Sequence, residues 1–144
     1  KGISLSISAA VALSKNGLDL PFFFNRKEVK DHGEGGTFVG YVPQAGEEIV
    51  IIEDVITAGT AVRESIELFK HVADVNMKAL FVSVDRMERG TRDCSTLDEL
   101  RQDYGIQVFP IVTVKDILET LTDEELSPEL RERMKAYMAQ YCVF

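Results

Sequence analysis

Two adjacent carboxylates and a turn of small residues stand close together in the middle of the sequence. Glu53 and Asp54 end a run of β-branched residues, and the turn Thr57-Ala-Gly-Thr60 begins three residues after Asp54. Backbone N–H groups and two hydroxyls at the start of a helix suit a phosphate, and Gly59 allows close approach of the backbone. The carboxylates would repel a phosphate, but they suit sugar hydroxyls or a metal ion. The pattern predicts a ribose 5-phosphate site; solvated strand-end acids beside a plain connecting turn are the alternative.

The stretch from residue 26 to residue 36 has a different character. It holds one apolar side chain in eleven residues and three glycines, so it cannot bury a face, and we expect a mobile loop. Its basic side chains are Arg26, Lys27, Lys30 and His32. Cations gathered on one loop suit the stabilisation of a leaving group with high negative charge. Three acids in the loop nearly balance these cations, so a solvated hairpin tip is the alternative.

The elements that must position these residues follow from apolar patterning. Continuous β-branched and apolar runs predict strands buried in a parallel sheet, and spacings of three and four predict helices between them. We expect strands over 20–24, 37–42, 49–52, 79–84 and 107–112, and helices over 3–13, after residue 59, and from Ser95, Thr113 and Ser127. The first of these helices is expected to be buried. The order predicts an α/β fold, a mainly parallel sheet flanked by helices, with residues 1–144 as one domain.

The composition of the chain argues against several classes of function. The 144 residues carry a net charge of −8, which argues against nucleic acid or an anionic membrane as partner. No apolar stretch approaches the ~20 residues that span a bilayer. The two cysteines lack metal-ligand spacing, so we expect free thiols in a reducing compartment, the cytoplasm. The opening Lys1-Gly2, without a Met, suggests that the chain belongs to a longer parent and is incomplete at its N-terminus.

Three segments carry a resemblance to a known family. Glu-Asp-Val-Ile-Thr-Ala-Gly-Thr-Ala, residues 53–61, resembles the motif of type I phosphoribosyltransferases that binds 5-phosphoribosyl 1-diphosphate (PRPP). The loop Phe24–Gly36 closely resembles the catalytic loop of orotate phosphoribosyltransferases. Val84-Asp-Arg-Met-Glu-Arg-Gly90 is similar to the segment on that family's orotate side. The resemblance runs over essentially the whole chain.

The resemblance implies transfer of ribose 5-phosphate from PRPP to orotate, giving orotidine 5′-phosphate and pyrophosphate in pyrimidine biosynthesis. It implies that Glu53 and Asp54 hold the ribose hydroxyls. The residues implied around the 5′-phosphate are Val55, Ile56, Thr57, Ala58, Gly59, Thr60 and Ala61. Thr57 and Arg86 are implied to face orotate, with Arg86 towards its carboxylate.

The pyrophosphate contacts implied by the resemblance are Lys1, Arg26, Lys27, Lys30 and His32. Lys30 and Asp54 are the implied catalytic residues. Mg²⁺ is implied as cofactor, held mainly by substrate oxygens and water rather than by a protein cage. A homodimer with shared active sites is also implied, in which Arg26, Lys30 and His32 serve the neighbouring subunit and Lys27 its own.

Two departures from the family pattern matter. The acidic pair is Glu-Asp, whereas Asp-Asp is common in the family, and the family's N-terminal segment has no counterpart in this chain. The alternative functions are a PRPP- or nucleotide-sensing regulator of the same fold that has lost catalysis, and a purine-type phosphoribosyltransferase.

Overall fold

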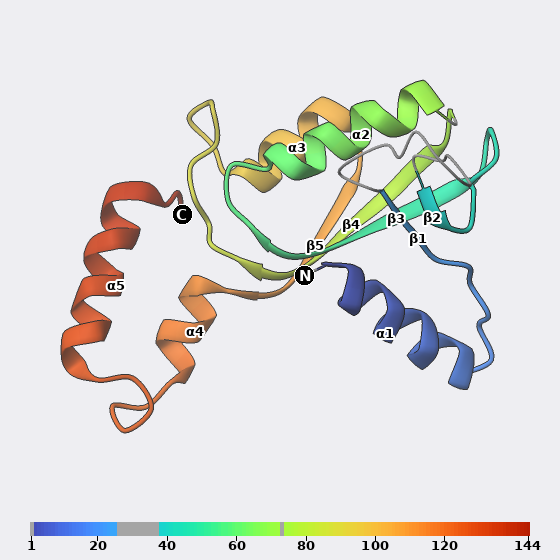
Figure 1. Ribbon diagram of the computed structural model, residues 1–144. Helices are drawn as coiled ribbons and strands as arrows, with labels where there is room; N and C mark the ends of the chain where they lie inside the picture. Colours follow the sequence, from blue (N-terminus) through green and yellow to red (C-terminus); the bar gives the residue numbers. More distant parts are fainter. Residues whose placement is uncertain (1, 26–37, 73) are drawn as a thin grey trace, which may run out of the picture.

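A three-stranded parallel sheet forms the centre of the computed structural model, which describes residues 2–25, 38–72 and 74–144. The strands β3 (Glu48–Ile56), β4 (Asn76–Asp85) and β5 (Gln107–Thr113) lie in the order β3-β4-β5 (Figure 1). Ile51 pairs with Leu80, which pairs in turn with Val108. The predicted α/β class and its parallel sheet are confirmed.

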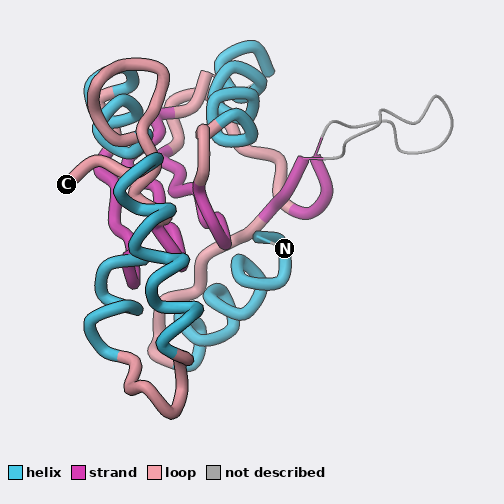
Figure 2. The backbone as a smooth tube through the Cα atoms, turned by 90° about the vertical axis from the view of Figure 1, so that its left-hand side faces the viewer, coloured by secondary structure: helices cyan, strands magenta, loops and turns pink. Residues whose placement is uncertain are grey.

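A second, antiparallel pair of strands accompanies this sheet. β1 (Phe23–Asn25) pairs with β2 (Phe38–Gly40), and Figure 2 shows the pair beside the parallel sheet. Both strands are shorter than predicted within the described residues. Phe38 packs on Phe69 of the next helix, with ring centroids 5.6 Å apart, so aromatic contacts fasten the pair to the domain.

Two helices cover one face of the parallel sheet. They are α2 (Thr60–Val72) and α3 (Thr96–Tyr104), and Figure 1 shows both on the same side. Their apolar stripes meet the sheet in a core of Ile56, Val62, Ile66, Leu80, Val82, Leu97, Leu100, Ile106 and Val108. The two helices that apolar spacing predicts after residue 59 and from Ser95 are therefore confirmed. The Ser95 hydroxyl accepts a hydrogen bond from the Asp98 N–H at 3.1 Å and caps α3 as its sequence predicts.

The opposite face of the sheet is only partly covered. α1 (Gly2–Lys15) contacts β3 there, and Figure 1 shows it across the sheet from α2 and α3. The helix is confirmed, but the expected burial is wrong, because no residue of α1 is buried within the described structure. Its apolar side chains Ile3, Ile7 and Val11 recur every four residues, yet each is more than a third exposed. Apolar patterning predicts a helix here, but burial also depends on a partner that covers its apolar side.

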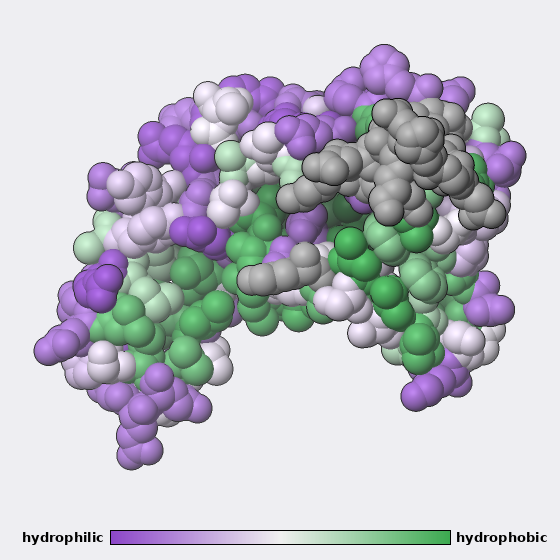
Figure 3. Space-filling model, viewed as in Figure 1, coloured by the Kyte–Doolittle hydropathy of each residue, from purple (hydrophilic) through white to green (hydrophobic). Residues whose placement is uncertain are grey.

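The uncovered part of this face is apolar. Phe81 and Phe109 stack on neighbouring strands with ring centroids 5.2 Å apart, and both are more than 40% exposed. Figure 3 shows apolar side chains gathered along a hollow between α1 on one side and α4 and α5 on the other. The α2–α3 face therefore holds the main core, and this face leaves large apolar groups in contact with solvent.

The chain ends in two helices beyond the sheet. α4 (Val114–Thr120) starts with the predicted cap, in which Thr113 and Asp116 exchange hydrogen bonds, and α5 (Pro128–Tyr141) starts at the predicted Ser127-Pro128. After α5 the chain returns to the segment that follows β4, where Cys142 forms a β-bridge with Glu88. Within the described residues, no helix is both long and apolar enough to cross a membrane.

Candidate functional site

The acidic pair lies inside strand β3 rather than after its end. The sequence predicts a strand over 49–52, but the parallel pairing with β4 continues through Val55 and Ile56. Both Glu53 and Asp54 are half-buried. Their position near the carboxyl edge of a parallel sheet is where ligands bind in folds of this kind.

The turn after β3 has the geometry that a phosphate site needs. Thr57, Ala58 and Thr60 are exposed, whereas Gly59 is buried and has a φ of +72°. A Cβ atom on Gly59 would lie 2.8 Å from the Cγ2 of Thr96, so glycine is required both by its backbone conformation and by contact with α3.

Helix α2 starts directly from this turn. The Arg63 N–H donates to the Gly59 carbonyl at 3.0 Å, and the first turn of α2 contains no acidic side chain. The first N–H groups of a helix have no partner within the helix, and they lie at the positive end of its dipole, where no acidic side chain of the first turn of α2 would repel an anion. This combination favours a phosphate at the start of α2.

The two carboxylates differ in their ionisation. Burial, followed by the neighbouring Asp54 carboxyl, raises the pKa of Glu53 above its ordinary value. Burial also acts to raise the pKa of Asp54, but hydrogen bonds from the Val55 backbone and with Glu53 outweigh it, and this pKa is lowered. Asp54 is therefore the more readily ionised member and the stronger acceptor for a sugar hydroxyl.

The helix α1 begins beside the same carboxylates. A Cβ atom on Gly2 would lie 2.9 Å from the Ile52 carbonyl oxygen and 3.3 Å from Glu53 Oε1. The starts of α1 and α2 and the end of β3 therefore meet at one edge of the sheet. Lys1, Arg26, Lys27, Lys30 and His32 lie outside the described residues, so their predicted roles stay predictions.

Strand register brings Thr57 and Arg86 to this edge. Ile56 is the Cα partner of Asp85 in the β3–β4 ladder, so Thr57 and Arg86 are the residues that directly follow the ends of two neighbouring strands. Because neighbouring strands lie about 5 Å apart, the two residues leave the sheet side by side. The structure thus brings together two residues that are 29 positions apart in the sequence.

The Arg86 side chain is held by two groups that the sequence analysis did not assign. Its Nη2 donates to the Tyr137 hydroxyl at 2.7 Å and pairs with Glu88 Oε1 at 2.9 Å. Tyr137 also donates a short hydrogen bond to Glu88, which raises the pKa of the Tyr137 hydroxyl. Tyr137 lies beside Met134 and Met138 on α5, and nothing in this local pattern points to a polar contact with a residue 51 positions away.

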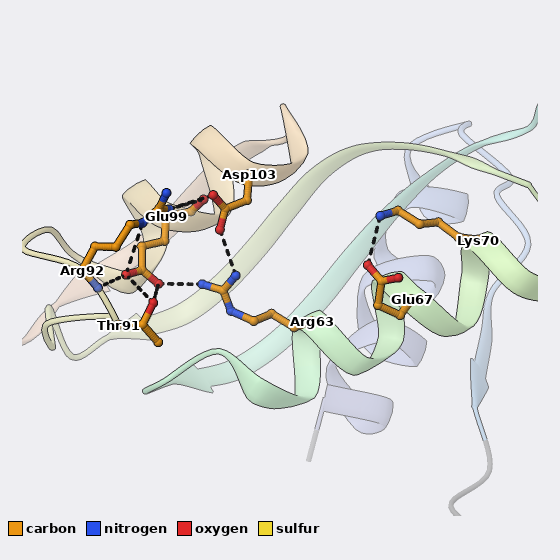
Figure 4. Close-up of polar contacts among 7 residues, drawn as sticks. All are labelled: Arg63, Glu67, Lys70, Thr91, Arg92, Glu99 and Asp103. Atoms are coloured by element: carbon orange, nitrogen blue, oxygen red, sulfur yellow. Dashed lines mark hydrogen bonds and ion pairs between the residues drawn. The ribbon is translucent and has the colours of Figure 1, made fainter.

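A buried carboxylate behind the turn was also missed. Glu99 of α3 is fully buried and accepts hydrogen bonds from Arg63 Nη2 at 2.7 Å, the Arg92 N–H at 2.5 Å and the Thr91 hydroxyl at 3.0 Å (Figure 4). Burial would raise the pKa of Glu99, but these hydrogen bonds and the arginine charges lower it. Because Arg63 lies in the first turns of α2, this network ties the helix that follows the phosphate turn to α3.

A cavity of about 290 Å³ lies elsewhere at this end of the molecule. Asp85, Cys94, Arg101 and the C-terminal Phe144 are among its lining residues, and none of the residues expected to contact PRPP is among them. The turn and the acidic pair form an open surface instead. We favour that surface as the functional site, because its backbone geometry and paired acceptors match a definite ligand chemistry.

Two known proteins that are similar to this chain share one name, although no family model matches the chain. It is 44% identical over 142 residues to an orotate phosphoribosyltransferase of Photorhabdus laumondii, and 47% identical over 146 residues to one of Chromobacterium violaceum. These matches cover 98% and 99% of this chain, but the chain spans only 65% of the length of each relative. The crystal structure of an orotate phosphoribosyltransferase from Francisella tularensis superposes with a TM-score of 0.76 at 30% identity, covering 99% of this chain and 67% of that one.

Proposed function

The chain belongs to the orotate phosphoribosyltransferase family, and from this premise we propose that it is the core domain, over residues 1–144, of an enzyme of pyrimidine biosynthesis. The reaction transfers ribose 5-phosphate from PRPP to N1 of orotate and releases pyrophosphate. The observation that carries the proposal is the meeting of the acidic pair, the Thr57–Thr60 turn and Arg86 at one edge of the sheet.

The turn is assigned to the 5′-phosphate. Residues 55–61 surround the start of α2, where exposed Thr57 and Thr60 add hydroxyl donors to the backbone N–H groups. No acid in the first turn of α2 opposes a bound anion. An anchored phosphate fixes one end of PRPP, so that the bond to pyrophosphate is held in a constant position for reaction.

The acidic pair is assigned to the ribose hydroxyls. Asp54, whose pKa is lowered, is ionised at neutral pH and accepts hydrogen bonds from the sugar. Cleavage of the bond between C1 and pyrophosphate makes the sugar resemble an oxocarbenium ion, and a fixed negative charge nearby stabilises it. Glu53 supplies the same acceptor chemistry with one more methylene than the aspartate common at this position.

The base end of the site is assigned to Thr57 and Arg86. A guanidinium group forms strong, directional hydrogen bonds with a carboxylate, and orotate carries a carboxylate that other pyrimidine and purine bases lack. An arginine next to the sugar site therefore favours orotate over a purine. This chemistry supports the orotate assignment over a purine-type enzyme.

The pyrophosphate end is assigned from the sequence alone. Lys1, Arg26, Lys27, Lys30 and His32 are proposed to contact the departing pyrophosphate, with Lys30 as the cation whose contact grows most in the transition state. We further propose a cytoplasmic homodimer with shared sites, in which Arg26, Lys30 and His32 act in the neighbouring subunit. Support for these assignments comes from the family's catalytic loop.

The residues present fit a Mg²⁺ ion that the substrate largely holds. Mg²⁺ takes one or two carboxylates together with substrate oxygens and waters, and Glu53 and Asp54 supply two adjacent carboxylates. Among the described residues, no group of three or more His, Cys, Asp or Glu side chains forms a protein cage for a metal. When bound, the ion neutralises part of the charge on pyrophosphate.

The test is the turnover of orotate with PRPP and Mg²⁺, followed by loss of orotate absorbance. It is run on this chain and on a version extended at its N-terminus to the length of its relatives. We expect orotidine 5′-phosphate and pyrophosphate from the extended protein, and no product with hypoxanthine or adenine. Turnover of a purine but not orotate would replace the proposal with the purine-type enzyme. Absence of turnover with retained PRPP binding would replace it with the regulator.

A further inference from the structure

Arg86 and its two partners form a closed triangle of polar groups on one side of the site. Arg86 Nη2 contacts both the Tyr137 hydroxyl and Glu88 Oε1, and Tyr137 donates to that same Glu88 oxygen. The Arg86 guanidinium also lies over the Tyr137 ring, with Cζ 5.4 Å from the ring centroid. Tyr137 therefore restrains the guanidinium both by a hydrogen bond and by contact with its flat face.

The triangle uses only part of the guanidinium. Within the described structure, neither Nε nor Nη1 of Arg86 makes a hydrogen bond, and the side chain is 41% exposed. These donors are available to an incoming carboxylate while Nη2 is held in place. A long side chain that is fixed before binding loses less conformational entropy when it binds, and this raises affinity.

The end of α5 is itself fastened to the segment that carries Arg86. The Arg89 N–H donates to the Tyr141 carbonyl at 2.8 Å, and the Val143 N–H donates to the Met87 carbonyl at 3.0 Å. The Cys142 thiol donates to the Arg86 carbonyl at 3.2 Å. These contacts hold the backbone on both sides of the triangle, so the Tyr137 hydroxyl is directed at Arg86 by a rigid support.

We propose that Tyr137 is a positioning residue for the base site: its hydroxyl, together with Glu88, holds Arg86 in the orientation that receives the carboxylate of orotate. The inference rests on the proposed function and assigns to the C-terminal helix α5 a part in substrate selection. It concerns the affinity for orotate and leaves the PRPP end of the site unaffected.

The test is steady-state kinetics of Tyr137→Phe in the N-terminally extended protein. This change removes the hydroxyl and keeps the ring. Loss of one hydrogen bond to a charged group should raise KM for orotate roughly ten-fold, with kcat and KM for PRPP changed less than two-fold. Tyr141→Phe is the matched control, since its ring packs on that of Tyr137 at 4.9 Å and none of the hydrogen bonds found in the described structure involves its hydroxyl. Its KM values should equal those of the unaltered protein.

A double-mutant cycle shows whether Tyr137 acts through Arg86. In an Arg86→Gln background, adding Tyr137→Phe should raise KM for orotate no further. Three results would overturn the positioning role. They are an equal rise in KM for orotate and for PRPP in Tyr137→Phe, an unchanged KM for orotate in that variant, or additive effects of the two substitutions on KM for orotate. If Arg86→Gln alone leaves KM for orotate unchanged, the assignment of Arg86 in the proposed function fails instead. Thermal melts followed by circular dichroism check that each variant is folded.

Discussion

Replacement of Glu99 by glutamine should destabilise the domain strongly, although Glu99 does not contact the proposed ligands. Its carboxylate receives hydrogen bonds from Arg63, Arg92 and Thr91 with no exposure to water. The glutamine amide has one acceptor oxygen, and its NH₂ group would face donors. We expect about two hydrogen bonds to be lost, at about 1.5–3 kcal/mol each where a charged group takes part.

Part of this loss is offset by Asp103. This carboxylate pairs with Arg63 at 3.0 Å and with Arg92 at 2.8 Å, so neither guanidinium is left without a counter-charge. We therefore expect the free energy of unfolding to fall by about 3 kcal/mol. Urea unfolding followed by circular dichroism measures this value directly.

Glu67→Gln is the matched control on the neighbouring helix. Glu67 pairs with Lys70 at 3.0 Å, but both side chains are about half exposed, and Figure 4 shows this pair apart from the Glu99 network. Exposed pairs of this kind contribute about 0.5 kcal/mol or less. If Glu99→Gln costs no more than Glu67→Gln, the buried network does not hold α2 against α3 and our reasoning is wrong.

Of three further predictions, two rest on the structure, and the third, for Lys30, rests on the sequence alone. Because the pKa of Glu99 is lowered in the folded state, its contribution to the free energy of unfolding is fully present above the ordinary glutamate pKa of about 4.3 and is lost as pH falls through the folded-state value. The difference in unfolding free energy between the parent and Glu99→Gln should therefore shrink in acid. A difference that stays constant with pH would contradict this. Gly59→Ala should lower the free energy of unfolding in urea by about 2–4 kcal/mol, because of the positive φ of Gly59 and its contact with α3. Gly17 has a positive φ but no atom near its Cβ position, so Gly17→Ala should lower it by only about 1–2 kcal/mol. Equal losses would show that the contact with α3 does not matter. Lys30→Ala in the extended protein should lower kcat about 10²–10³-fold while PRPP binding, measured calorimetrically, persists, and unchanged turnover would remove the role of Lys30.

Much of the fold was predictable because its signals are local. The β-branched run from Ile49 to Ile52 predicts a buried parallel strand; the parallel strand β3 is confirmed there, but the expected burial on both faces is wrong, because Val50 is 51% exposed. Ser95 with Asp98, and Thr113 with Asp116, predict helix starts through hydrogen bonds within four residues, and both caps are present. The strand runs on through Glu53 and Asp54 because pairing with β4 outweighs the polar character of those residues.

The remaining features depend on contacts that the sequence does not show. The apolar residues of α1 predict a helix, but these side chains are exposed because no element in the described structure packs over them. Tyr137 lies beside Met134 and Met138 on its helix, where a packing role is the natural interpretation, whereas Glu99 has mostly polar neighbours in the sequence, which are typical of a solvated acid. Only the return of α5 to the segment after β4 places the Tyr137 hydroxyl against Arg86.

A crystal structure of the N-terminally extended protein with PRPP and Mg²⁺ would test the central claim most directly. We predict the 5′-phosphate within hydrogen-bonding distance of the backbone N–H groups of Ala58, Gly59 and Thr60, with the ribose hydroxyls on Glu53 and Asp54. A phosphate bound away from this turn, for example beside Arg101 in the neighbouring cavity, or a ribose that makes no contact with either carboxylate, would contradict the account.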